Sequence, residues 1–143
     1  MATAVCFLIP SIERTASLSG DVGGLVLVMP DFGCPTGAVY RAFDERPVRG
    51  LRDDEVREMA HAGRVEAAAL FNDLEDAAIA VAPGLEALFG RVERVCAGRR
   101  VMLSGSGSTV FTLCASGREA RKLAEAIEGE LGDAARAVGV GFV

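Results

Sequence analysis

The sequence contains few of the residues that several classes of functional site require. Lys122 is the only lysine and His61 the only histidine among 143 residues, and the arginines are scattered among acidic residues. With a net charge of -5, this distribution argues against a surface that binds nucleic acid or an anionic membrane. No apolar stretch approaches the roughly 20 residues of a membrane-spanning helix. The start of the chain lacks a basic segment and a small-residue cleavage site, so we expect a cytoplasmic protein.

The sequence also gives little indication of a metal site or of disulfide bonds. The four cysteines are widely separated and lie in apolar surroundings, with no CxxC motif and no cysteine–histidine pairing. A domain of this size needs no disulfide to fold, so we expect reduced thiols and no metal site. His61 stands alone, and we interpret it as a surface histidine near the end of a helix.

A glycine- and serine-rich centre near the C-terminus is the most informative feature of the chain. Between two apolar, β-prone runs lies the pentapeptide Ser104-Gly105-Ser106-Gly107-Ser108. Its glycines allow positive φ angles, and its hydroxyl and amide groups could hydrogen-bond a phosphate. No Lys-Ser/Thr pair follows, and the next segment is β-prone rather than helical, which excludes a Walker-type phosphate loop. Two interpretations stay open: a tight hairpin turn of small residues, and a turn that contacts phosphate.

Hydrophobic periodicity along the rest of the chain predicts one α+β domain, with helices on one face of a small antiparallel sheet. We expect a strand at the N-terminus, a polar loop over 10–24, and a strand over 25–29 buried on both faces. Thr36 is expected to cap a short helix through Asp44 that buries Val39, Tyr40 and Phe43. A second helix is expected to begin at Asp53 and Asp54 and to end at Gly63. Two further helices are expected over 64–82 and from Pro83 to about 95. The Gly/Ser hairpin, a helix from Ser116 and a last strand over 137–143 complete the predicted order.

Three stretches together resemble the C-terminal half of the GHMP small-molecule kinases. They are MPDFGCPTGAVY at 29–40, LFNDLE at 70–75 and LSGSGSTVF at 103–111. The Asn-Asp-Leu-Glu segment and the threonine before a short helix resemble the branch that phosphorylates 4-diphosphocytidyl-2-C-methyl-D-erythritol, in non-mevalonate isoprenoid synthesis. The likeness covers roughly 25–143.

The resemblance implies a ferredoxin-like domain of an ATP- and Mg-dependent kinase that acts on the 2-hydroxyl of this small-molecule substrate. It implies that the turn of Ser104, Gly105, Ser106, Gly107 and Ser108 lies beside the nucleotide phosphates. Thr36 is a candidate for the substrate side, with a helix cap as the alternative. Asn72 is a second candidate, expected mid-helix with Asp73, and a buried structural hydrogen bond is its alternative role. A solvated helix face accounts for Asp73 and Glu75 equally well.

The sequence also departs from that family at its start. Nothing matches the family's main phosphate loop, and Ala4-Val5-Cys6-Phe7 stands where a catalytic aspartate segment is expected. We therefore assign no catalytic residue, interpret 1–24 as the remnant of a preceding domain or a linker, and assign 25–143 to the kinase C-terminal-like domain. The expected partner is an N-terminal kinase domain, without which we expect inactivity and exposure of an apolar patch that favours a homodimer. The alternatives are a non-catalytic association module and an unrelated ferredoxin-like sensor of small ligands.

Overall fold

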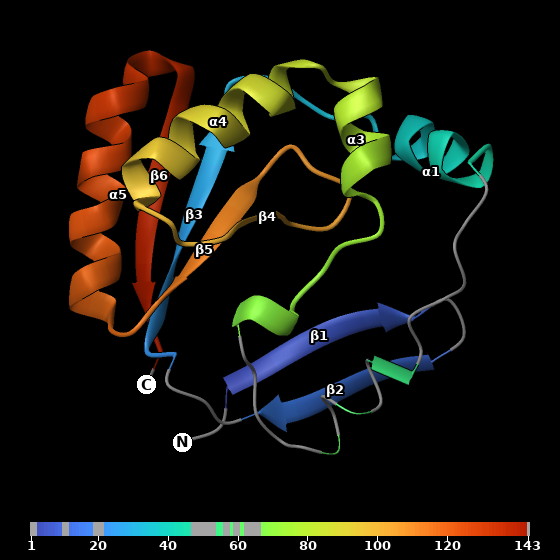
Figure 1. Cartoon of the computed structure of the whole chain (residues 1–143), viewed down its shortest axis with the longest axis horizontal. Coiled ribbons are helices and arrows are strands. Elements are labelled where there is room, and N and C mark those ends of the chain that lie inside the picture. Colours follow the sequence, from blue (N-terminus) through green and yellow to red (C-terminus); the bar gives the residue numbers. More distant parts are fainter. Residues whose placement is uncertain are drawn as a thin grey trace.

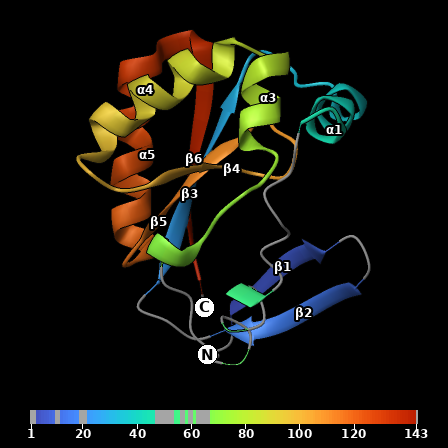
Figure 2. The same cartoon turned by 45° about the vertical axis from the view of Figure 1, so that its right-hand side comes forward.

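The computed structural model describes residues 3–9, 12–18, 22–46, 54, 55, 58, 61 and 67–142, which form a hairpin and an α+β domain. Strand β1 (Thr3–Ile9) pairs with β2 (Ile12–Leu18) in an antiparallel hairpin. In Figures 1 and 2 this hairpin lies below the larger sheet. The strand at the N-terminus is as expected, but the loop expected over 10–24 is wrong for 12–18. Residues of this segment pair with β1 along its whole length.

The larger sheet is antiparallel and has the order β4-β5-β3-β6. It consists of β3 (Gly24–Pro30), β4 (Val101–Leu103), β5 (Val110–Cys114) and β6 (Ala135–Gly141). From β3 onward the chain runs through one strand, several helices, two strands, one helix and a last strand. Strand β3 lies between its partners, with Leu27 opposite Phe111 on one side and Val138 on the other. The expected α+β class with an antiparallel sheet is confirmed.

Two amphipathic helices, α4 (Gly84–Cys96) and α5 (Gly117–Leu131), cover one face of this sheet, as Figures 1 and 2 show. Ser116 caps the N-terminus of helix α5, because its hydroxyl accepts a hydrogen bond from the amide of Glu119. Both helices bury the apolar residues that recur every three or four positions, as predicted. The buried side chains of this layer include Leu85, Leu88, Val92, Ala120, Ala124, Ile127 and Leu131. Among the described residues, no helix is both long and apolar enough to cross a membrane.

The segment expected as one helix over 64–82 is not continuous in its described part. A 3-10 turn, η1 (Ala67–Ala69), is followed by non-helical residues, and helix α3 (Glu75–Val81) begins only after Leu74. The break occurs because the Asn72 side chain accepts a hydrogen bond from the Leu74 amide, which competes with helical bonding. The mid-helix position expected for Asn72 and Asp73 is therefore wrong.

The helix expected before this segment lies mostly outside the described residues, and so does Gly63. Its described members, which include Asp54 and His61, are helical and exposed.

Strand β3 is buried on one face only, which corrects the expectation of burial on both. Val26 and Val28 point into the helix-covered core and are fully buried. Leu25 and Leu27 alternate with them and are half-buried. Because directly paired residues share a face, Leu27 continues a row from Phe111 to Val138, and Leu25 lies in a parallel row. Val138 and Val140 are 36% and 38% exposed, so this second face presents apolar side chains to the outside.

Candidate functional site

The Gly/Ser segment forms the connection between β4 and β5, as predicted. The Gly107 amide donates to the Ser104 carbonyl at 3.0 Å, and the Ser104 amide donates to Thr109 at 2.9 Å. Gly105 occupies the first central position of this turn with φ +58°, and Gly107 has φ +87°. Both values lie in the region that favours glycine, so local geometry alone explains why glycine stands at these positions.

The first of the three stretches, 29–40, lies directly against this turn. The hydroxyls of Thr36 and Ser106 are 3.0 Å apart, and the Ser108 hydroxyl donates to the Phe32 carbonyl at 2.6 Å. Thr36 is the first residue of helix α1 (Thr36–Asp44) and not its cap. Pro35 takes the cap position, because its carbonyl accepts from the amides of residues 38 and 39. The Thr36 hydroxyl thus points to the Gly/Ser turn and makes no capping bond.

Helix α1 has the predicted bounds but buries fewer side chains than expected. Val39 is fully buried and Phe43 is half-buried against the core, whereas Tyr40 is 46% exposed. The expected burial of Tyr40 is therefore wrong, since it lies on the outer side of a helix at the edge of the domain. Helix α1 packs instead on α3.

The second stretch, 70–75, reaches the same turn through Asn72. Its side-chain nitrogen donates to the carbonyls of Leu103 and Gly105, at 3.0 and 2.7 Å, while its oxygen accepts from the Leu74 amide at 3.0 Å. All three stretches that carry the resemblance therefore meet at one end of the sheet. Three loops that are far apart in sequence form one site around the Gly/Ser turn.

The five residues predicted to contact phosphate differ in the groups they have available. The amides of Ser104 and Gly107 are used within the turn, and the Ser108 hydroxyl is held by Phe32. Within the described part of the chain, the amides of Gly105, Ser106 and Ser108 donate to no other group. The segment 101–113 carries no charged side chain. Any anion bound here would be stabilised by neutral backbone and hydroxyl dipoles.

Sequence analysis missed two residues that contact the Gly/Ser turn, Phe32 and Cys34. Phe32 packs against the first turn of α4, where a Cβ on Gly84 would lie 3.2 Å from its ring. A Cβ on Gly107 would lie 3.1 Å from a Leu103 methyl and 3.4 Å from the Cys34 Cβ, so this glycine also allows close packing. The only available signal was two apolar residues, Phe32 and Cys34, within a segment expected to be a turn.

The thiols of Cys34, Cys96 and Cys114 are free. Cys96 and Cys114 are buried in the core, and Cys34 is half-buried beside the turn. Burial raises the pKa of all three thiols above the ordinary value, because a thiolate loses hydration in these surroundings. They are therefore poor nucleophiles at neutral pH and serve packing.

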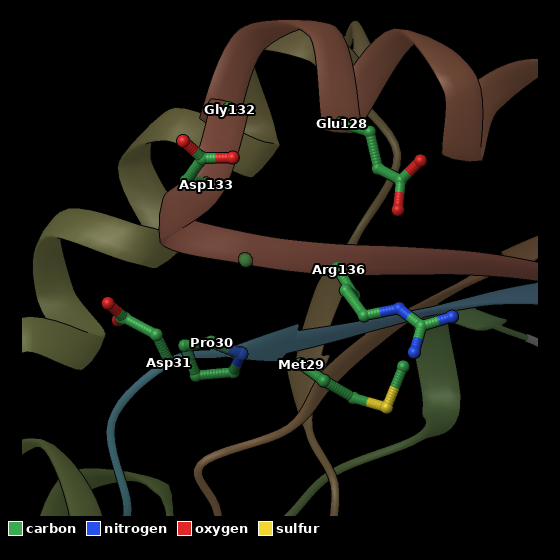
Figure 3. A pocket seen from close by; sticks show the side chains of 8 residues that line it. Met29, Pro30, Asp31, Glu128, Gly132, Asp133 and Arg136 are labelled. Carbon is green, nitrogen blue, oxygen red and sulfur yellow. The ribbon is translucent and has the colours of Figure 1, made fainter.

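A hollow of about 670 Å³ lies at the same end of β3, on the side of β6 and α5. Figure 3 shows Asp31 and Asp133 toward one end of this hollow and Arg136 beside Met29 toward the other. Glu128 adds a third carboxylate, whose oxygen accepts the Ala137 amide at 3.0 Å. Three carboxylates against one guanidinium disfavour an anionic ligand, so this hollow does not suit nucleotide phosphates. These three carboxylates are not arranged to hold a metal ion, and neither is any other group of three or more His, Cys, Asp or Glu side chains among the residues that the structure describes.

Comparison with known proteins assigns the family. The family model for the C-terminal domain of GHMP kinases matches residues 54–134. A 4-diphosphocytidyl-2-C-methyl-D-erythritol kinase of Caulobacter vibrioides is 39% identical over 112 residues, covering 72% of this chain and 37% of that protein. A putative kinase of the same name from Streptococcus mutans is 32% identical over 107 residues, covering 73% and 38%. The chain thus spans less than two fifths of the length of these relatives.

Two solved structures are similar. A 4-(cytidine 5'-diphospho)-2C-methyl-D-erythritol kinase, 31% identical, superposes with a TM-score of 0.63 over 92% of this chain and 47% of its own. The homoserine kinase of Cytophaga hutchinsonii has a TM-score of 0.59 at 17% identity, over 92% of this chain and 45% of its own, and shares the fold alone. The family match, together with the predicted stretches meeting at one turn, shows that the chain belongs to the GHMP kinases and corresponds to their C-terminal domain.

Proposed function

We propose that this chain is the C-terminal domain of a kinase that transfers phosphate from ATP to the 2-hydroxyl of 4-diphosphocytidyl-2-C-methyl-D-erythritol. One observation carries the proposal: Thr36, Asn72 and the Gly/Ser turn meet at a single site. Relatives of that name are 32% and 39% identical to the chain over 73% and 72% of its length.

The Gly/Ser turn is proposed to contact the nucleotide phosphates through the amides of Gly105, Ser106 and Ser108. These groups fit phosphate oxygens because they are hydrogen-bond donors with no other described partner. The turn is held by several side chains, so it would offer these donors with little reorganisation during phosphoryl transfer. ATP supplies the transferred phosphoryl group, and Mg²⁺ would offset its charge.

The hydroxyl of Thr36 is proposed to line the substrate side of the same site. It is exposed, lies at the start of α1, and its one described partner is the Ser106 hydroxyl. A hydroxyl can donate and accept at once, so Thr36 can keep this contact while it bonds a substrate group. This residue would couple the position of substrate to the position of the turn.

The chemistry requires groups that the Gly/Ser turn does not supply. In-line phosphoryl transfer depends on positioning, on charge stabilisation and on a group that orients the attacking hydroxyl. The 101–113 segment carries no charge, so the turn can contribute positioning but neither a base nor a cation. We assign the base, the main phosphate loop and the metal ligands to an N-terminal kinase domain, and expect no turnover by this chain alone.

A chimera tests this assignment in cells. The C-terminal part of the Caulobacter vibrioides kinase would be replaced by residues 25–143 of this chain and expressed in bacteria depleted of their own enzyme. We expect growth to be restored by the chimera and lost with Thr36→Val combined with Ser106→Ala. Failure of a soluble, well-expressed chimera would count against the assigned substrate.

The alternative is a non-catalytic module that keeps the fold and associates through its sheet. The apolar rows that end at Val138 and Val140 favour this function, since they offer a contact surface. The chimera separates the two functions: an association module would be produced in folded form but would not restore growth.

A further inference from the structure

Asn72 contacts the Gly/Ser turn through backbone carbonyls only, and all its described hydrogen bonds are internal. Its side-chain nitrogen donates both hydrogens, to Leu103 and Gly105, and its oxygen accepts the Leu74 amide. Both donor hydrogens are thus committed. Asn72 could donate a hydrogen bond to substrate only by breaking one of these two bonds, whereas its oxygen keeps a second lone pair.

The bond to Gly105 has a consequence for the next amide. The carbonyl of Gly105 and the amide N–H of Ser106 belong to one peptide unit, and this peptide bond is trans. In a trans peptide the two groups point in opposite directions. By holding the Gly105 carbonyl at 2.7 Å, Asn72 turns the Ser106 N–H to the opposite side of the loop.

The bond to Leu103 provides an internal comparison for this geometry. The Leu103 carbonyl is likewise held by Asn72, and the amide that follows it, Ser104, donates across the turn to Thr109 at 2.9 Å. The amide after Gly105 is oriented in the same manner but has no described partner. Asn72 therefore orients two peptide units. The Ser104 amide of the first closes the turn, and the Ser106 amide of the second is available as a donor.

We propose that Asn72 is a positioning residue, which orients the Ser106 amide toward the nucleotide phosphate and does not itself donate a hydrogen bond to substrate. The proposal rests on the proposed phosphate contact of the turn. Gly105 has φ +58°, and glycine is the residue with the widest choice of conformation, so a side-chain clamp is needed to keep this peptide in one orientation. The same hydrogen bonds account for the non-helical conformation of Asn72 ahead of α3.

The test is an NMR titration of the 143-residue chain with inorganic tripolyphosphate, following backbone amides. We expect the Ser106 amide to shift on titration in the wild type. In Asn72→Asp the carboxylate keeps the bond from Leu74 but cannot donate to the two carbonyls. The carbonyl carbon resonances of Leu103 and Gly105 should move in that variant, and the affinity for tripolyphosphate should fall about tenfold.

Ser116→Ala is the matched control, because it removes one hydrogen bond at the opposite end of β5. It should leave the carbonyl resonances of 103 and 105 and the tripolyphosphate affinity unchanged. Asn72→Ala is measured beside Asn72→Asp, because it removes both donated bonds without adding a negative charge near the anion, and it should show a similar loss.

The outcomes distinguish this inference from the function on which it rests. Unaltered affinity and unaltered Ser106 shifts in folded Asn72 variants would overturn the positioning role and leave the phosphate contact intact. No shift at Gly105, Ser106 or Ser108 in the wild type would overturn both. Loss of affinity in Ser116→Ala equal to that in Asn72→Asp would show that general stability, and not the clamp, governs binding.

Discussion

Gly105 is a residue whose conformation is required by the turn that it occupies. Its φ of +58° is costly for any residue with a Cβ, although nothing lies within 4 Å of a Cβ built there. The cost of substitution is therefore backbone strain and not a clash. The φ angle of Gly105 therefore helps to set the direction of the neighbouring amides.

We predict that Gly105→Ala lowers the free energy of unfolding by about 1 kcal/mol or more. Gly90→Ala is the matched control, since Gly90 lies within α4 with open space around its Cα and alanine is the better helix former. That variant should be more stable by about 0.5–1 kcal/mol. Urea denaturation would measure both. Equal effects in the two variants would contradict the assigned strain.

The packing of α5 on β6 is unusually close at its glycine contacts and determines how these elements meet. A Cβ on Gly139 would lie 2.4 Å from the Ala120 carbonyl carbon, which real contacts do not allow. Alanine there must push α5 away from the sheet and disturb the buried layer that includes Ile127.

Gly139→Ala should therefore destabilise the chain by about 3 kcal/mol, a fall in Tm of roughly 10 °C. Gly129→Ala provides the control, because Gly129 lies on the exposed side of α5 with nothing within 4 Å. Calorimetry should show an unchanged or raised Tm for that variant. A small effect of Gly139→Ala would mean that the helix is less closely packed than described.

The buried thiols make stability depend on pH in the alkaline range. Cys96 and Cys114 have a raised pKa in the folded state, so between the unfolded and folded values the unfolded chain binds fewer protons. Stability from these neutral thiols is complete below the ordinary pKa and is lost as pH rises through the folded value.

We expect the free energy of unfolding to fall above about pH 9, and to fall less in Cys96→Ala/Cys114→Ala. Chemical denaturation from pH 7 to 10 measures both slopes. A second measurement uses Cys6→Ser/Cys34→Ser, in which the remaining thiols should react with a thiol reagent only on unfolding. Rapid reaction in the native state would contradict their burial.

Most helices and strands whose positions depend on local sequence pattern were predicted correctly. The helices at 36–44, 84–96 and 117–131, the β4–β5 hairpin and the strand around 26–28 follow from periodicity and turn residues. The helix over 64–82 was wrong because its alanine-rich composition favours helix, whereas the Asn72 side chain bonds a turn more than 30 residues away. Thr36 was expected to cap a helix, but its hydroxyl instead contacts the hydroxyl of Ser106, which is distant in sequence.

At the scale of the whole molecule, the sheet face opposite the helices is the surface expected to contact a partner. Val138 and Val140 are more than a third exposed, and they lie in rows with Leu27 and Leu25. A contiguous apolar surface of this kind is usually covered in a stable protein. The proposed N-terminal kinase domain is the natural cover, and in its absence two copies can cover each other.

We predict that the isolated chain self-associates and that Val138→Lys shifts it toward monomer. Gly129→Lys adds the same charge on exposed α5 and should leave the association unchanged. Sedimentation velocity over a range of concentrations measures both. A monomer at high concentration in the wild type would remove the argument for this surface.

The measurement that tests the central claim most directly is ADP release from Mg-ATP and 4-diphosphocytidyl-2-C-methyl-D-erythritol. It would compare the purified chain alone with the chain co-expressed with the N-terminal half of a related kinase. The account predicts no turnover by the chain alone, turnover by the pair, and a strong reduction of the pair's activity by Asn72→Asp. Turnover by the chain alone, or a folded and associated pair with no activity, would contradict it.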